Sequence, residues 1–518
     1  MSDGDTLVQA LLDPAAWPHP VDDLRMLETH ISWVFLTGEY AYKIKKPVVL
    51  TFLDFSALEM RKHWCGEEIR LNSRWAPQLY IDVVPISGSA DAPEVGGGGT
   101  PIEYAVRMRQ FPQSALLSER LAAGRIDADD MIELADMIAD RHANLPVHRE
   151  ARFGSPAAIT KPMHENFVYI EPVLEEPTLS ELKDWTDAEL DRCSAAIDSR
   201  WREGFLRACH GDLHLRNLVH LEDGIVAFDC VEFSDELRIL DVISDIGFLT
   251  MDLVANDRAD LARTVINRYL EVSGDYGGMR LYGMYYVYHC LIRAKVDAIR
   301  AAARVPGEEQ QRDAFLDSMR HYCRVAMNWI HRPRPALIVM HGFSGSGKTW
   351  VSSRLLQSLY AVRIRSDIER KRLYGIGERA SSSSAPGEGL YGTDESAATH
   401  DHMLDIARQL LNSGHRVILD ASFLRSEERK RARSLAGEKG VPFVLVDVDA
   451  ASDVLERRIE SRQAENKDAS EANLDVLEHQ RRHSDPLDDE TDGPVVRYEC
   501  RDDGDLDELA RTIGSIIE

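Results

Sequence analysis

The chain has few cysteines and no long apolar run. Seven cysteines are spread over 518 residues, their number is odd, and no two of them form a C-x-x-C pair. We therefore expect buried, reduced thiols rather than a disulfide framework. The acidic N-terminus lacks the apolar core of a signal peptide, and no apolar stretch is long enough to span a bilayer. These absences predict a cytoplasmic protein without a membrane partner.

Positive charge is also scarce. Lys and Arg number 61 against 87 Asp and Glu, which gives a formal net charge of -26. This surplus opposes binding to nucleic acid phosphates, so nucleic acid is not an expected partner. The length exceeds what one hydrophobic core supports, and we expect several domains. The composition leaves the oligomeric state open.

Two prolines mark a candidate domain boundary. Pro333 and Pro335 precede an apolar run and disfavour helix. We expect one domain over 1–332 and a second over 333–518. The first is expected to be α+β and bilobal, with a small lobe over about 20–112 and a helical lobe over about 113–332. Its expected elements are strands over 31–36, 40–44 and 103–109, a helix over 56–75, and mostly helical stretches over 115–200 and 238–330.

Downstream of residue 336, short apolar strands alternate with helical stretches. This alternation predicts an α/β domain whose parallel sheet carries helices on both faces. The expected strands are 337–341, 361–365, 416–419 and 442–448. The serine run at 381–384, followed by Pro386-Gly387, predicts a mobile loop.

The segment 210–217 reads H-G-D-L-H-L-R-N. Asp212 and Asn217 are five residues apart, which is the spacing of the catalytic Asp and the metal-binding Asn in a kinase catalytic loop. Downstream, the apolar strand at 225–228 ends at Asp229, a second candidate magnesium ligand.

A lysine-bearing strand lies upstream of this loop. Ala41-Tyr42-Lys43 resembles the A-I-K of kinases, so Lys43 is the candidate for contacting the α- and β-phosphates. Lys45 projects from the same strand face and is the alternative. On the following helix, Glu67 or Glu68 would orient that lysine.

Residues 1–330 resemble the aminoglycoside-phosphotransferase-like, or protein-kinase-like, superfamily, which uses H-G-D-x-x-x-x-N. The segments I-S-W-V-F-L-T-G-E-Y-A-Y-K-I-K-K-P at 31–47 and E-Y-A-V-R-M-R-Q-F at 103–111 resemble a bacterial family described as bifunctional aminoglycoside phosphotransferase/ATP-binding proteins. The resemblance implies a bilobal kinase with ATP in the cleft and Glu68 as the helix glutamate. No G-x-G-x-x-G loop is present, so the turn at 29–32 is expected to cover the phosphates.

A P-loop follows the apolar run at 337–341. The segment G-F-S-G-S-G-K-T at 342–349 matches G-x-x-x-x-G-K-T, and a helical stretch over 350–359 follows it. We expect Lys348 to reach the β- and γ-phosphates and Thr349 to bind magnesium. The strand 417–420 ends in Asp420, a Walker-B pattern that would order the metal's waters. The candidate nucleotide-binding residues are Gly342, Ser344, Gly345, Ser346, Gly347, Lys348 and Thr349.

Asp367 ends the strand that follows the P-loop helix. In P-loop kinases of small hydroxyl substrates, a carboxylate there accepts or positions the hydroxyl proton. Arg458 and Arg462 are four apart on a predicted helix and resemble lid arginines, with Arg457 as the alternative. Residues 336–500 resemble the gluconate-kinase-like and zeta-toxin-like P-loop kinases. Three further arginines crowd Asp367 and would either hold an anionic substrate or form a solvated helix face: Arg365, Arg370 and Arg372.

These motifs predict a bifunctional kinase that uses ATP and Mg²⁺. Each domain would transfer phosphate to a hydroxyl of a small molecule, with Asp212 and Asp367 as the two bases. A sugar-, aminocyclitol- or nucleoside-like acceptor follows from family analogy, and we expect the two sites to act independently. The alternatives are one kinase regulated by a P-loop ATPase, an aminoglycoside resistance kinase, and a toxin-like kinase.

Overall fold

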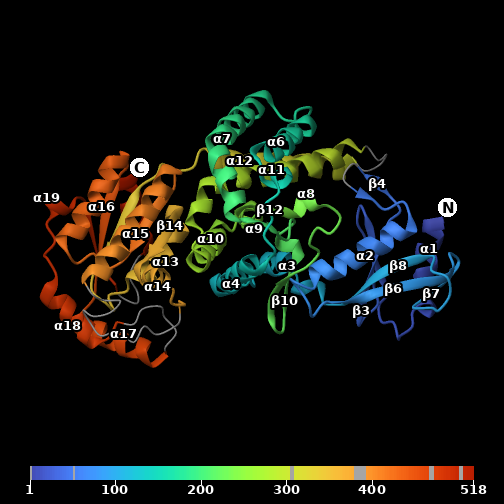
Figure 1. The fold of residues 1–518 in the computed structure, drawn as a ribbon, viewed down its shortest axis with the longest axis horizontal. Helices are drawn as coiled ribbons and strands as arrows, with labels where there is room; N and C mark the ends of the chain where they lie inside the picture. The colour runs from blue at the N-terminus through green and yellow to red at the C-terminus, as the bar shows by residue number, and fades with distance from the viewer. Residues whose placement is uncertain (1–2, 51–52, 304–308, 379–392, 466–471, 501–505) are drawn as a thin grey trace. The chain divides into compact units, whose positions relative to one another are not determined.

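The computed structural model describes residues 3–50, 53–303, 309–378, 393–465, 472–500 and 506–518 (Figure 1). The predicted loop at 381–387 lies outside these residues. The chain forms two compact units, one of residues 1–165 with 194–252 and the other of 166–193 with 253–518. The proline-marked boundary lies inside the second unit, so the division at residue 333 stays a prediction.

The first unit contains a six-stranded antiparallel sheet in the order β1-β2-β3-β8-β6-β7. The strands predicted around the hairpin at residues 37–39 are confirmed, with β2 beginning one residue later than expected. The strands are β1 (Arg25–Glu28), β2 (Ser32–Leu36), β3 (Tyr40–Lys45), β6 (Tyr80–Ser89), β7 (Ala92–Val95) and β8 (Glu103–Arg109).

Helix α2 (Leu58–Asn72) packs against β6 and β8 of this sheet. Its buried positions 61, 65, 68 and 72 recur every three or four residues, which places Glu68 on the face toward the sheet. The helix is shorter than the predicted 56–75, because Pro77 cannot continue it and the chain turns after Asn72.

The H-G-D segment lies in irregular backbone between β9 (Leu206–Ala208) and the short 3₁₀ turn η3 (Leu215–Asn217). Strand β9 pairs with β12 (Ile239–Asp241), and β10 (Leu218–Leu221) forms a hairpin with β11 (Gly224–Ala227). Gly211 has a φ of 81°, and a Cβ there would lie 2.7 Å from the carbonyl oxygen of Leu237. Only glycine fits this turn.

The helical segments predicted downstream of residue 115 are confirmed. The longer ones are α4 (Ala128–Asn144), α6 (Pro156–Ile170), α7 (Glu176–Glu203), α9 (Val242–Ala255), α10 (Ala259–Ser273), α11 (Met279–Ala302) and α12 (Glu309–Ile330). Within the described residues, no helix is both long enough and apolar enough to cross a membrane.

The second unit contains the predicted parallel sheet, with five strands in the order β14-β15-β13-β16-β17. Helix α13 (Lys348–Leu359) and α20 (Leu506–Ile517) share a core with one face, and α15 (Thr393–Asn412) contacts β14 and β15 and packs beside α16 (Ser426–Lys439). Strand β14 is an edge strand of this sheet. The strands are β13 (Leu337–His341), β14 (Ala361–Arg365), β15 (Arg416–Asp420), β16 (Phe443–Asp449) and β17 (Val495–Glu499).

Candidate active sites

A buried network of charges joins β3, α2 and the segment after β11. Lys43 Nζ lies 2.9 Å from Glu68 Oε1, and Lys45 Nζ lies 2.7 Å from Glu68 Oε2. Lys43 also pairs with Asp229, and Lys45 pairs with Glu232. Burial by itself would raise the pKa of Glu68, but the two ammonium groups lower it from 4.5 to about 2. Glu68 is therefore a carboxylate shared by both lysines.

The sequence left two choices open, Glu67 or Glu68 and Lys43 or Lys45, and the members of each pair have different surroundings in the structure. Glu67 points away from the lysines and binds the guanidinium of Arg70, 2.8 Å from its Nε, on the same helix. Lys45 is fully buried, whereas the Asp229 side chain that contacts Lys43 is 42% exposed. Lys43 is thus the lysine beside a solvent-accessible carboxylate, and Lys45 is enclosed.

Asp212 and Asn217 are in direct contact. Asn217 Nδ2 donates to the backbone oxygen of Asp212 at 2.9 Å and to its Oδ2 at 3.0 Å. The His214 Nε2 lies 3.4 Å from the same Oδ2. The Asp212 side chain is 42% exposed, so a substrate hydroxyl can approach it.

Asp229 is tied to the same loop through its neighbour. The Phe228 N–H donates to the backbone oxygen of Asn217 at 2.9 Å, and the His210 Nε2 lies 3.0 Å from the backbone oxygen of Phe228. Asp229 has a φ of 61°, and its N–H donates to the Tyr80 hydroxyl at 3.0 Å. The oxygen-bearing side chains of Asn217 and Asp229 are of the type that magnesium prefers. These two residues fit a magnesium site in which waters and phosphate oxygens would supply the remaining ligands.

Two carboxylates that the sequence reading missed support this loop. Asp245 on α9 accepts from the N–H groups of His210 and Gly211, both at 3.0 Å, and lies 3.1 Å from His142 Nε2. Asp252 on the same helix accepts from the Leu215 N–H at 3.0 Å. The signal was present in the sequence, because two acids seven residues apart in an apolar helix share one face.

The turn expected to replace a glycine-rich loop lies between β1 and β2. Thr29 and Ser32 close it, with a backbone hydrogen bond of 2.9 Å and a bond of 3.0 Å from the Ser32 N–H to the Thr29 hydroxyl. Its role in covering phosphates stays a prediction.

The second candidate site is built on the P-loop between β13 and α13. Gly347 has a φ of 98°, and a Cβ there would lie 2.6 Å from Cys500 Sγ, so this position also requires glycine. Lys348 Nζ donates to the oxygens of Gly342 and Phe343 at 2.8 and 2.7 Å. Desolvation lowers the pKa of Lys348 from 10.5 to about 8. The partly buried ammonium group is therefore held by two backbone carbonyls of the loop.

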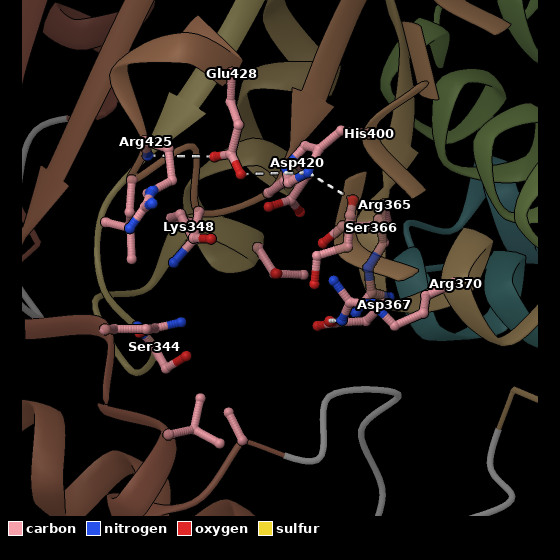
Figure 2. A pocket seen from close by; sticks show the side chains of 18 of the residues that line it. Ser344, Lys348, Arg365, Ser366, Asp367, Arg370, His400, Asp420, Arg425 and Glu428 are labelled. Carbon is pink, nitrogen blue, oxygen red and sulfur yellow. Dashed lines mark hydrogen bonds and ion pairs between the residues drawn. The ribbon is translucent and has the colours of Figure 1, made fainter. Parts of the chain in front are cut away.

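A cavity of about 750 Å³ opens beside this loop. Lys348 and Asp367 lie on either side of it in Figure 2, and Asp420 lines it as well. The expectation that Asp367 ends the strand is wrong, because β14 ends at Arg365 and Asp367 is the second residue of α14 (Ser366–Leu373), 3.5 Å from Arg370 Nη1. Further predicted residues that line the cavity are Ser344, Gly345, Gly347, Thr349, Arg365, Arg458 and Arg462.

The remaining predicted residues lie around the cavity but not in its lining. Gly342 and Ser346 belong to the buried part of the loop, and Arg457 is exposed on the face of α17 (Ser452–Glu465) away from it. Arg372 turns instead toward Glu369.

The lining also contains residues that the sequence reading missed. His400 comes from α15, upstream of Asp420, and four charged residues come from the segment after β15 and from α16: Arg425, Glu427, Glu428 and Arg431. The signal was the charged run itself, which reads equally well as a solvated helix face.

Asp420 is held at the end of β15. Its Oδ2 accepts from the Ser352 hydroxyl at 2.9 Å. With the hydroxyl of Thr349 in the same cavity lining, Asp420 supplies the oxygen ligands that suit magnesium. The residues of the P-loop site therefore also fit the metal.

Comparison with known proteins covers both halves of the chain. Residues 113–282 match the model of the phosphotransferase enzyme family, and residues 337–487 match the model of an AAA domain. Among solved structures, choline kinase from Cryptosporidium parvum is 11% identical, with a TM-score of 0.40 over 63% of this chain and 96% of its own. A gluconokinase from Sinorhizobium meliloti is 21% identical, with a TM-score of 0.24 over 35% of this chain and 90% of its own.

Two mycobacterial proteins match nearly the whole chain. A protein of Mycobacterium tuberculosis and one of Mycobacterium bovis, both described as uncharacterized, are each 31% identical over 461 residues, which is 87% of this chain and 89% of theirs. The resemblance inferred from the motifs is confirmed. The chain therefore belongs to the same family as these mycobacterial proteins, and it is a kinase in which a domain of the phosphotransferase enzyme family precedes a P-loop domain.

Proposed function

We propose that the chain is a cytoplasmic bifunctional kinase with two Mg-ATP sites, each transferring the γ-phosphate to a hydroxyl of a small molecule. The acceptors would be sugar-, aminocyclitol- or nucleoside-like. The observation that carries this proposal is that each half of the chain holds its own lysine and its own pair of carboxylates, Lys43 with Asp212 and Asp229 in the first and Lys348 with Asp367 and Asp420 in the second. The seven cysteines are buried free thiols, which suits a reducing compartment.

In the first site, Asp212 accepts the proton of the acceptor hydroxyl as the oxygen attacks, and Asn217 holds the carboxylate in position. Lys43, oriented by Glu68, would contact the α- and β-phosphates in place of its contact with Asp229. Asn217 and Asp229 would hold Mg²⁺, which neutralises charge on the β- and γ-phosphates when bound.

In the second site, Asp367 takes the proton and Lys348 leaves its backbone carbonyls for the β- and γ-phosphates. Thr349 and Asp420 would hold the metal and its waters. Arg458 and Arg462, which line the same cavity, stabilise charge on the phosphoryl group in transfer.

The test is a phosphate-transfer screen of the full chain against a metabolite library with labelled ATP. We expect at least one labelled product that disappears in Asp212→Asn and another that disappears in Lys348→Ala. A screen in which every labelled product depends on one site alone would contradict the bifunctional proposal.

A second candidate gives the P-loop domain a regulatory role. It is favoured by the second compact unit, in which residues 253–332 and the P-loop part are packed as one body. ATP hydrolysis that needs Lys348 but labels no acceptor, together with a first-site reaction whose rate follows P-loop occupancy, would support this candidate instead.

A further inference from the structure

Helix α10 lies along the edge strand β14 within the second compact unit (Figure 1). Asn267, which is 3% exposed, binds the strand's backbone with both ends of its amide. Its Nδ2 donates to the Ala361 oxygen at 3.1 Å, and its Oδ1 accepts from the Arg363 N–H at 2.8 Å. A residue from the segment matched to the phosphotransferase family thus completes the hydrogen bonding of a strand in the P-loop sheet.

One turn further along α10, Glu271 reaches the side chain of Arg363. Glu271 Oε1 accepts from Arg363 Nε at 3.0 Å and from Nη2 at 2.7 Å, and its Oε2 lies 3.9 Å from Arg365 Nη1. The carboxylate is buried, at 3% exposure. Desolvation would raise its pKa, but the charges of Arg363 and Arg365 lower it below the usual value. Glu271 is therefore an anion paired with arginines of β14.

The other end of the Arg363 guanidinium faces the P-loop site. Its Nη1 donates to the hydroxyls of Ser352 at 3.0 Å and Ser353 at 2.6 Å, and lies 4.0 Å from Asp420 Oδ2. Arg363 thus lies between two carboxylates, in close contact with Glu271 and farther from Asp420.

Because Arg363 is closer to Glu271 than to Asp420, the charge on Glu271 determines whether the guanidinium attracts Asp420. A buried charge that loses its partner is strongly destabilised, so it pairs with the nearest group of opposite charge. If Glu271 were neutral, Asp420 would be the carboxylate that remains within 4.0 Å of Arg363 among the described residues. The guanidinium would then draw Asp420 into an ion pair and away from the waters of the metal.

We propose that Glu271 is a positioning residue for the P-loop site: by binding Arg363, it leaves Asp420 available to order the magnesium ion. The inference rests on the proposed function of that site in binding Mg-nucleotide. The P-loop site is then completed by a helix that lies outside the matched P-loop segment.

The same end of α10 also holds the helix that carries Asp367. Arg372 of α14 donates to the backbone oxygen of Glu271, and the Tyr276 hydroxyl donates to Glu369 Oε1 at 3.2 Å. Both carboxylates assigned to the P-loop site, Asp367 and Asp420, are therefore supported from this one helix and the turn after it.

The experiment titrates the full chain with a non-hydrolysable ATP analogue, with magnesium and again with EDTA, by calorimetry. The P-loop site is the one lost in Lys348→Ala. We expect Glu271→Gln to weaken magnesium-dependent binding at this site about tenfold, and to leave binding in EDTA unchanged because Lys348 and the loop are intact. The matched control is Asp260→Asn, which makes the same change on the same helix at a carboxylate that pairs with Arg258.

A second variant separates positioning from a general structural role. Arg363→Met removes the guanidinium that competes for Asp420, so the double variant Glu271→Gln/Arg363→Met should recover magnesium-dependent binding toward the wild-type value. This variant also carries the test if Glu271→Gln alone does not fold, because it removes the guanidinium that Glu271 contacts most closely. The inference would be overturned if nucleotide affinity at this site depended on magnesium equally in Glu271→Gln and Asp260→Asn. It would also be overturned if Glu271→Gln lost the same affinity with magnesium as in EDTA. If Lys348→Ala removes no nucleotide site, the proposed function of the P-loop fails first, and the inference fails with it.

Discussion

The side-chain amide of Asn217 donates to both the backbone oxygen and the carboxylate of Asp212, at 2.9 and 3.0 Å. The segment 212–217 is therefore closed by the Asn217 amide nitrogen, and the amide oxygen takes no part in these two bonds. This geometry joins the proposed base to a proposed metal ligand, because a change in the position of the Asn217 amide would break its bonds to Asp212.

Asp212→Asn is expected to reduce turnover at the first site by about 10²–10⁴-fold, because the amide cannot take the hydroxyl proton. Nucleotide binding should change little, since Lys43 and Asp229 are untouched. Steady-state rates and calorimetry on the full chain measure the two effects. Asp223→Asn, in the exposed turn between β10 and β11, is the control. Unchanged turnover in Asp212→Asn would remove the residue from its role.

Lys43 and Lys45 are expected to separate into a ligand-binding and a structural residue. Lys45→Met removes the buried ammonium group that pairs with both Glu68 and Glu232. We expect this change to lower the free energy of unfolding by about 3–5 kcal/mol. Lys43→Met should cost less, because water reaches the half-exposed Asp229, but it should weaken ATP binding at the first site. Denaturant unfolding and nucleotide titration of both variants check this. If Lys45→Met weakened ATP binding and Lys43→Met caused the larger loss of stability, Lys45 would be the phosphate contact.

Nucleotide binding at the P-loop is expected to weaken above pH 8. The pKa of Lys348 is lowered to about 8 in the free protein, so the amine is largely neutral at pH 9. Phosphates favour the ammonium form, so binding takes up a proton there, and affinity falls by about tenfold per pH unit until the pKa of the bound state is reached. Calorimetry in buffers of different ionisation enthalpy detects this uptake. Lys348→Arg, which stays charged, should lose the pH dependence. A pH-independent affinity between pH 7 and 9.5 would contradict the assignment.

Lys348→Ala should stop transfer by the P-loop site and spare the reaction that depends on Asp212, because the first site has its own lysine. If the sites act in parallel, product analysis should show that Lys348→Ala loses only the P-loop product and that Asp212→Asn loses only the first-site product. If Lys348→Ala stops both reactions while nucleotide still binds at the first site, the P-loop controls the first site or supplies its substrate. Adding phosphorylated intermediates to the variant distinguishes these two outcomes.

The local parts of both sites could be predicted from the sequence. The P-loop and the H-G-D loop are contiguous motifs, and the strand that carries Lys43 has a clear period of two. Glu68 was separated from Glu67 by family resemblance alone, and its burial on the face of α2 gives the physical reason.

The parts that could not be predicted depend on contacts between distant residues. Glu271 and Arg363 are 92 residues apart, and no periodicity in either segment indicates that they meet. The prolines at 333 and 335 indicate where helix cannot continue, but they carry no information on which elements pack together afterwards. For this reason the compact units divide elsewhere than at the prolines.

The amide of Asn267 has a consequence for synthesis of the chain. Strand β14 is at the edge of its sheet, and an uncovered edge invites pairing with strands of other molecules. Helix α10 precedes β14 in the chain, so the helix that covers the strand is synthesised before the strand. A P-loop fragment made without α10 would expose that edge and aggregate as its concentration rises. The position of α10 before the P-loop in the chain therefore makes the cover of this edge available from the moment the strand is synthesised.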